Sequence, residues 1–347
     1  MDDVQPPISY LQLHAQVSRI LLIGPSNIGD AILASDVVAA LRSGFPGAHL
    51  TLVVGERAQM LFAGDPRIQT LVNADAFSSS IGRLRLAWSL WRYQPQVVVD
   101  LRHTLYPIML KPLTVWRYFR QPPKRLSHMR ERHLWKLRVH AGIAASSNGA
   151  LWLSPKDTAH VEQLLKRWRM DPAQPLVVIC PGARSHIKRW TAEGFAQVAD
   201  RLIAEARVSV VFCGEPDEEV IVEEVLASMH QPAHNAVGLT TIRQAGALMQ
   251  RAALVITNDS ASLHLASALD VPTVAIFGPT DAHKYGPTAT RHHTIRRQLF
   301  CSPCEQALCR FNHECMRFIA PQEVYDAALE LLGHGTRDMR HGVEKGS

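Results

Sequence analysis

The sequence lacks several features that would assign it to a class of protein at once. No apolar run approaches the roughly 20 residues that a helix needs to cross a bilayer. The first residues, MDDVQPPISYLQ, have neither the basic nor the apolar region of a secretory signal. No Asp-x-Asp pair occurs, so the chain lacks a common clamp for a metal-bound diphosphate. We therefore expect a cytoplasmic protein, a prediction that leaves work at a membrane surface open.

The composition is that of an ordinary globular protein, with 347 residues of which 47% are hydrophobic and 20% charged. This length predicts two domains, each large enough for its own core. The segment RMDPAQP (169–175) carries two prolines and is the expected linker. We expect a first domain at residues 1–172, a second domain at 173–320, a closing helix at 321–332 and a disordered tail at 333–347.

Strand-like and helix-like patterns alternate in both halves, each apolar strand being followed by a helical period. The expected strands are 19–24, 49–55, 68–74, 96–101, 176–182, 208–214, 254–259 and, as the last one, 272–278. The expected helices are 30–47, 57–64, 83–95, 192–206, 217–229, 242–252, 260–270 and 321–332. Continuous apolar strands separated by helices predict parallel sheets covered on both faces, hence an α/β protein of two doubly wound domains. Ligands are then expected at the carboxyl ends of the strands, in a cleft between the domains.

Positive charge is concentrated between Arg102 and His140, where ten Lys or Arg residues face one acid, Glu131. The net charge of that segment is +9, whereas the net charge of the whole chain is +6. The rest of the chain is therefore net negative. Aromatic residues are interleaved with the cations: Tyr106, Trp116, Tyr118, Phe119 and Trp135. A merely solvated basic face remains one interpretation. The aromatics favour the other, an anionic partner such as a phosphorylated glycolipid, a membrane surface or a nucleic acid.

The stretch GPSNIGD (24–30) follows the first predicted strand and has the Gly-x4-Gly spacing of a phosphate loop. Asp30 and Ala31 occupy the positions where a Walker loop needs Lys and Ser or Thr, so that interpretation fails. The dinucleotide pattern G-x-G-x-x-G is missing as well. A close turn remains, with a carboxylate beside helix amides, and Asp30 has either a capping role or a chemical one.

Two stretches of the second half resemble phosphate-binding turns. CPGARSHIKRW (180–190) follows a strand and offers Ser185 and Lys188, although an exposed basic loop would look the same. ITNDSASLHLASALD (256–270) has small residues at a helix start, where amides attract a diphosphate. Within it, His264 faces either the ligand or the core, and Asp259 caps its helix, binds a ligand or does both.

Four cysteines lie within fifteen residues, in the pattern Cys301-x2-Cys304-x4-Cys309-x5-Cys315. This spacing is typical of an all-thiolate metal site, with zinc as the default and iron as the other candidate. Reduced structural thiols and disulfides are the alternatives, the latter disfavoured in the cytoplasm. Cys180 and Cys213 lie at strand ends and are expected to be buried apolar residues.

Taken together, these motifs resemble glycosyltransferase family 9, the ADP-heptose:lipopolysaccharide heptosyltransferases. The resemblance covers residues 18 to 332 and rests on SNIGDAILAS, PGARSHIKRW, NDSASLHLASALDVPTVAIFGPTD and CSPC in this order. It implies the GT-B fold, with the acceptor on the first Rossmann-like domain and the nucleotide-sugar on the second. It also implies an inverting displacement at the anomeric carbon that needs no metal.

The resemblance assigns roles to matching positions. Asp30 would be the general base that deprotonates the acceptor hydroxyl, and Lys188 would contact the donor diphosphate. Ser260 and Ala261 stand where many members have Thr-Gly, a mild departure that still allows amide donation. The acidic segment GEPDEE (214–219) resembles the part that reaches the nucleoside, and Glu215 is our choice within it. The expected donor-binding set is Ser185, Lys188, Glu215, Asp259, Ser260, Ala261 and His264.

The predicted activity is transfer of heptose from ADP-heptose to an inner-core lipopolysaccharide acceptor at the cytoplasmic face of the inner membrane. From its charge we assign the basic segment to an anionic acceptor near a membrane. The residues chosen for acceptor binding are Arg102, Lys124, Arg125 and Arg130. A transferase using another nucleotide-sugar or a protein acceptor is the alternative, and an epimerase on the same fold is a weaker one. A metal-dependent nucleic-acid module would leave both nucleotide loops without a purpose, so no nucleic-acid partner is expected.

Overall fold

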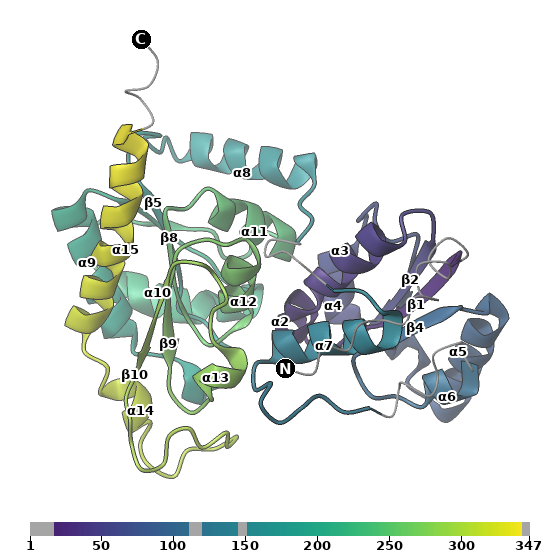
Figure 1. The fold of residues 1–347 in the computed structure, drawn as a ribbon. Helices are drawn as coiled ribbons and strands as arrows, with labels where there is room; N and C mark the ends of the chain where they lie inside the picture. Colours follow the sequence, from purple (N-terminus) through teal and green to yellow (C-terminus); the bar gives the residue numbers. More distant parts are fainter. Residues whose placement is uncertain (1–16, 111–119, 145–150, 342–347) are drawn as a thin grey trace. The chain divides into compact units, whose positions relative to one another are not determined.

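The computed structural model of the chain describes residues 17–110, 120–144 and 151–341, with side chains up to residue 333. The chain divides into two compact units, Met1–Trp152 and Leu153–Ser347, and each is described by itself (Figure 1). Both units consist of a parallel sheet with helices packed against it, which confirms the predicted α/β class. Within the described residues, no helix is both long enough and apolar enough to span a bilayer.

The first unit contains a four-stranded sheet of order β3-β2-β1-β4. Its strands are β1 Arg19–Ile23, β2 His49–Val54, β3 Thr70–Asn73 and β4 Val97–Asp100. Ile23 pairs with Val53 on one side and with Asp100 on the other, so the carboxyl ends of three strands meet at one edge. All four strands were predicted. Strands β1, β2 and β4 are buried and apolar because helices cover both faces of a parallel sheet, whereas β3 at its edge is only half-buried.

The helices of the first unit depart from the prediction near this edge, and two of them, Tyr106–Leu110 and Met129–Ala141, were not predicted. The structure has α2 Ile28–Leu33, α3 Ser35–Gly44, α4 Glu56–Phe62, α5 Ser80–Tyr93, α6 Tyr106–Leu110 and α7 Met129–Ala141. The predicted helix 30–47 is two helices, because the chain bends at Ala34, and it begins before Asp30. Leu86 and Leu90 of α5 pack on Leu21 and Val98 of the sheet.

The second unit contains a six-stranded sheet of order β10-β9-β8-β5-β6-β7. Its strands are β5 Leu176–Cys180, β6 Ser209–Phe212, β7 His234–Asn235, β8 Leu254–Asn258, β9 Thr273–Phe277 and β10 His292–Arg296. The prediction that the strand at 272–278 is the last one is wrong, because β10 follows it. The sequence HHTIR of β10 is polar and half-exposed, as suits an edge strand, and it lacks the apolar run by which we recognised the others.

The helices of the second unit are α8 Pro155–Arg167, α9 Ala192–Ala206, α10 Glu219–Ala227, α11 Ile242–Gln250, α12 Ala261–Ala268, α13 Ala282–Tyr285, α14 Glu314–Arg317 and α15 Pro321–His341. The unit begins at Leu153, before the linker expected at 169–175. The reason is α8, which packs on α11 and whose Asp157 pairs with Arg243 at 3.3 Å. The predicted disordered tail 333–347 is likewise corrected, since α15 continues to His341; residues 342–347 lie outside the described part.

Candidate active site

Asp30 lies in the loop and helix that follow β1. Gly24 ends the strand, and its amide donates a 2.8 Å hydrogen bond to the carbonyl of Val53. An added Cβ at Gly24 would lie 2.8 Å from the Val54 side chain, so this close turn requires glycine. Asn27 is the N-cap of α2, and Asp30 lies within its first turn, partly exposed. Asp30 is therefore not the N-cap itself but the third residue of the helix.

Helix α7 supports the two short helices that carry Asp30. His133 of α7 is buried and hydrogen bonds to the carbonyl of Leu33 at the end of α2. Burial lowers the pKa of His133 to about 3, so its ring is neutral at physiological pH. Arg130 of α7 binds Asp36 of α3 through a contact of 2.5 Å between Nε and Oδ2. These two contacts fix α2 and α3 against α7.

The basic segment 102–140 does not form one uniform surface. Arg102, Lys124 and Arg125 are exposed and available to an anion. Arg130 instead pairs with Asp36 and is largely buried, so the structure places it in the scaffold. Lys136 is buried too, and its Nζ donates to the carbonyl of Leu101 at 2.8 Å. Lys111, Arg117, Trp116, Tyr118 and Phe119 lie outside the described residues.

In the second unit, Asn258 joins the two loops that were predicted to bind the donor. It ends β8, and its side-chain nitrogen donates to the carbonyl of Pro181 at 2.7 Å. Its side-chain oxygen accepts from the amide of Trp190 at 3.1 Å. Both ends of the loop 181–190 are thereby held against β8. We had singled out the residues around Asn258 but not Asn258 itself, whose partners are about 70 positions away.

Lys188 of the loop 181–190 and Asp259, which follows β8, form an ion pair. Lys188 lies at the end of the 3-10 helix His186–Lys188, which begins after Ser185. Its Nζ is 2.7 Å from Oδ2 of Asp259, and the two side chains are 32% and 5% exposed. Lys188 thus keeps an accessible side toward solvent, whereas Asp259 is buried. Asp259 pairs with Lys188 instead of capping the helix that follows it.

The helix that follows, α12, begins without a side-chain cap from its N-cap residue. Ser260 is the N-cap in extended conformation, and its side chain accepts no capping hydrogen bond from the first turn. Ser260 Oγ lies 3.3 Å from Thr257 Oγ1. The small side chain of Ala261 leaves the amides of the first turn approachable. His264 is buried in the same helix, one turn further on.

The acidic segment after β6 directs Glu218 toward this region. An added Cβ at Gly182 would lie 2.1 Å from Cδ of Glu218, so the carboxyl group fills the space that glycine leaves. Burial raises the pKa of Glu218, and its Oε2 accepts from the amide of Glu215 at 2.9 Å. Glu215, our choice from the sequence, is the N-cap of the short helix Pro216–Glu218. The sequence reasoning missed Glu218 because the register of GEPDEE was ambiguous.

The four cysteines of residues 301–315 do not assemble the predicted metal site. Among the residues described, no group of three His, Cys, Asp or Glu side chains is arranged to hold a metal ion. Cys315 belongs to α14 and packs into the core of the unit, while Cys301, Cys304 and Cys309 lie half-exposed in the preceding loop. Cys309 Sγ accepts instead from the amides of Phe311 and His313. All six cysteines of the chain are free thiols, and Cys180 and Cys213 are buried as predicted.

Comparison with known proteins agrees with this arrangement. Residues 112–314 match the family described as glycosyltransferase family 9 (heptosyltransferase). Lipopolysaccharide heptosyltransferase 2 of Salmonella typhimurium is 25% identical over 343 residues, which cover 90% of this chain and 98% of that protein.

Solved structures extend the likeness to the fold. A family 9 glycosyltransferase from Veillonella parvula superposes with a TM-score of 0.76 at 22% identity, over 91% of this chain and 97% of that chain. E. coli ADP-heptose lps heptosyltransferase II gives a TM-score of 0.71 at 23% identity, over 92% of this chain and 99% of that chain. These matches confirm the predicted GT-B class of fold. Because the family match spans more than half of its residues, the chain belongs to glycosyltransferase family 9, the heptosyltransferases.

Proposed function

We propose that this glycosyltransferase moves a heptose from ADP-heptose to a phosphorylated lipopolysaccharide core acceptor, with inversion at the anomeric carbon and without a catalytic metal. The observation that carries the proposal is the ion pair of Lys188 and Asp259 beside the uncapped start of α12. A cation and a row of helix amides are the groups that a leaving diphosphate needs.

On the donor side, the diphosphate would lie against the first turn of α12 and Lys188. Asp259 holds the Nζ of Lys188. The exposed side of the Lys188 side chain leaves room for a phosphate oxygen. Glu218, aimed at Gly182 between the same loops, is positioned to accept a hydrogen bond from a hydroxyl of the nucleoside. The E. coli relative is an ADP-heptose lps heptosyltransferase, which supports ADP as this nucleoside diphosphate.

On the acceptor side, Asp30 would act as the general base. It would accept the proton of the acceptor hydroxyl while that oxygen forms its bond to the anomeric carbon and the bond from this carbon to the diphosphate breaks. ADP then leaves with the electron pair of the broken bond, and its charge is stabilised by Lys188 and the amides of α12. Attack opposite to the leaving group inverts the anomeric configuration.

The exposed cations of the first unit support an acceptor that carries phosphate. Arg102, Lys124 and Arg125 are exposed, and no acid lies between Leu101 and Arg130. Surface arginines recognise phosphate through charge-assisted hydrogen bonds. The set of residues that we propose for acceptor binding is therefore smaller than the one predicted from the sequence, because Arg130 forms an ion pair with Asp36.

The test is a thermal-shift panel of nucleotide-sugars followed by a transfer assay with a core acceptor. A ligand at about 100 times its dissociation constant should stabilise the protein by about 2.7 kcal/mol. We expect ADP and ADP-heptose to shift the melting temperature and UDP- or GDP-sugars to leave it unchanged. A shift with UDP- or GDP-sugars alone would show another donor, and transfer to a protein with none to the core would show the other acceptor class.

A further inference from the structure

Helix α5 of the first unit is apolar on two faces. Its inner face, with Leu86, Ala87 and Leu90, is buried against the sheet. Its outer face carries Ile81, Leu84, Trp88 and Trp91, which are 66%, 68%, 58% and 57% exposed. A helix with apolar residues all round is normally buried on all sides. The exposed stripe of α5 is therefore a feature that the stability of the unit does not explain.

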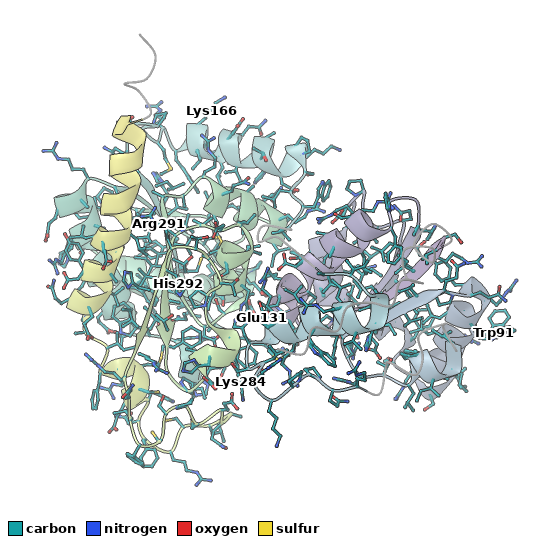
Figure 2. The ribbon with its side chains drawn as sticks, viewed as in Figure 1. Trp91, Glu131, Lys166, Lys284, Arg291 and His292 are labelled. Atoms are coloured by element: carbon teal, nitrogen blue, oxygen red, sulfur yellow. The ribbon has the colours of Figure 1, made fainter. Side chains whose placement is uncertain are left out.

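The four exposed residues form one continuous stripe. Positions 81, 84, 88 and 91 follow the i, i+3, i+7, i+10 spacing that brings side chains onto one side of a helix. Figure 2 shows Trp91 at the outer margin of the first unit, directed away from its sheet. Helix α6 lies beside α5 (Figure 1) and adds Ile108 and Met109, 40% and 50% exposed. Leu105, just before α6, is 72% exposed.

The stretch of chain that contains this stripe carries charge of a single sign. Arg83, Arg85 and Arg92 belong to α5, and no acidic residue occurs between Asp75 and Asp100. On a helix with about 100° per residue, Arg85 and Arg92 lie along one edge of the stripe. The guanidinium of Arg92 lies 4.8 Å from the centre of the Trp88 ring. Large apolar side chains are thus combined with cations in a stretch of chain, residues 76–99, that contains no acid.

We propose that the outer face of α5, with the neighbouring residues of α6, docks on an anionic phospholipid bilayer. Tryptophan side chains concentrate at the boundary between headgroups and acyl chains, and an amphipathic helix rich in Arg, Trp and Leu lies in that plane. Each arginine adds attraction to anionic headgroups. A second copy of the chain fits less well, because a twofold contact through this face would bring Arg85 and Arg92 close to their own counterparts.

This proposal deepens the proposed function, since a lipid-anchored acceptor lies at a membrane, but it concerns other residues and another assay. From the sequence we had assigned membrane contact to the basic segment 102–140. The structure shifts the main contact to α5, which precedes that segment and has both the apolar area and the charge.

The experiment measures binding of the full chain to acceptor-free vesicles by co-sedimentation. Vesicles of phosphatidylcholine alone are compared with vesicles that also contain phosphatidylglycerol. We expect binding only to the anionic vesicles and weaker binding at high salt. The double variant W88Q/W91Q should lose at least ten-fold in partitioning, and R85Q/R92Q should lose on the order of ten-fold on anionic vesicles. The matched control is Val220→Gln, which removes an apolar side chain of similar exposure, 64%, from α10 and should bind as wild type.

Folding and activity are checked separately. The variants should keep the wild-type melting temperature and the wild-type shift with ADP, so that a loss of lipid binding is not a loss of fold or of donor binding. If a Trp variant unfolds, Leu84→Gln tests the same stripe with one smaller change. Equal binding of wild type and W88Q/W91Q to anionic vesicles would overturn the proposal. So would a wild-type dimer in solution that W88Q/W91Q converts to a monomer, because the face would then be a protein interface.

Discussion

Lys188 Nζ and Asp259 Oδ2 lie 2.7 Å apart although 71 positions separate the two residues in the chain. The carboxylate of Asp259 is buried and the ammonium of Lys188 is partly exposed, so the pair holds the lysine at the start of α12. In the proposed reaction the donor diphosphate shares this cation with Asp259. In this proposal the pair would have a structural role before the donor binds and an electrostatic one afterwards.

Lys188→Met should affect both roles. It leaves the carboxylate of Asp259 buried without its partner, and we expect a loss of about 1–3 kcal/mol in the free energy of unfolding. The melting-temperature shift with ADP should also shrink strongly. The double variant K188M/D259N should recover much of the stability, as measured by urea unfolding, without recovering ADP binding. A full recovery of ADP binding in that double variant would contradict the role of Lys188 in holding the diphosphate.

Asp30→Asn should abolish transfer while donor binding persists. The amide has nearly the same shape but cannot take up the proton of the acceptor hydroxyl, so we expect the turnover number to fall by at least 100-fold. The shift of the melting temperature with ADP should equal that of wild type. Asp326→Asn, at an exposed position of α15, is the matched control and should transfer normally. Wild-type turnover in Asp30→Asn would exclude the general-base assignment.

Gly182→Ala tests the place of Glu218. The new methyl group would lie 2.1 Å from Cδ of Glu218 and must displace it. We expect a lower free energy of unfolding and weaker ADP binding, measured by urea titration and by calorimetry. Gly47→Ala is the control, because an added Cβ there meets nothing within 4 Å. The stability cost of Gly182→Ala should be smaller in a Glu218→Ser background, and an equal cost in both backgrounds would refute the contact.

Acid should destabilise the first unit through His133. Burial lowers its pKa from the ordinary 6.5 to about 3 in the folded state. Between these values the unfolded chain binds a proton that the folded chain does not, so stability is lost as the pH falls from 6.5 toward 3. His133→Gln should make this fall less steep by up to about 1.4 kcal/mol per pH unit, in urea unfolding between pH 4 and 7. Replacing the exposed His283 with Gln should leave the slope unchanged.

The alternation of strands and helices could be read from the sequence because it depends on near neighbours. An apolar run such as RILLI forms a buried strand wherever helices cover it, and the eight predicted strands are all present. Hydrophobic periodicity gives no signal where an element is polar or very short. That is why β10, with the sequence HHTIR, and the two-residue β7 were missed.

The family resemblance could also be recognised from local motifs, since each loop of the expected donor site is a short contiguous stretch. What those stretches could not show is which side chains meet. Arg130 looked like a ligand for an anion, but its long-range partner Asp36 makes it part of the scaffold. Cys315 had the spacing of a metal ligand, but it is buried in the core, and the four cysteines are not arranged to hold a metal ion among the described residues.

Local sequence thus determined the two α/β units, the family and the position of Asp30 and Lys188 in the segments that follow strands. The tertiary structure decided the pairing of Lys188 with Asp259, the position of the Glu218 carboxyl group beside Gly182, and the exposure of the second apolar face of α5. The physical reason is that burial and ion pairing depend on groups brought from distant parts of the chain. Propensity and periodicity depend only on the residues within a few turns.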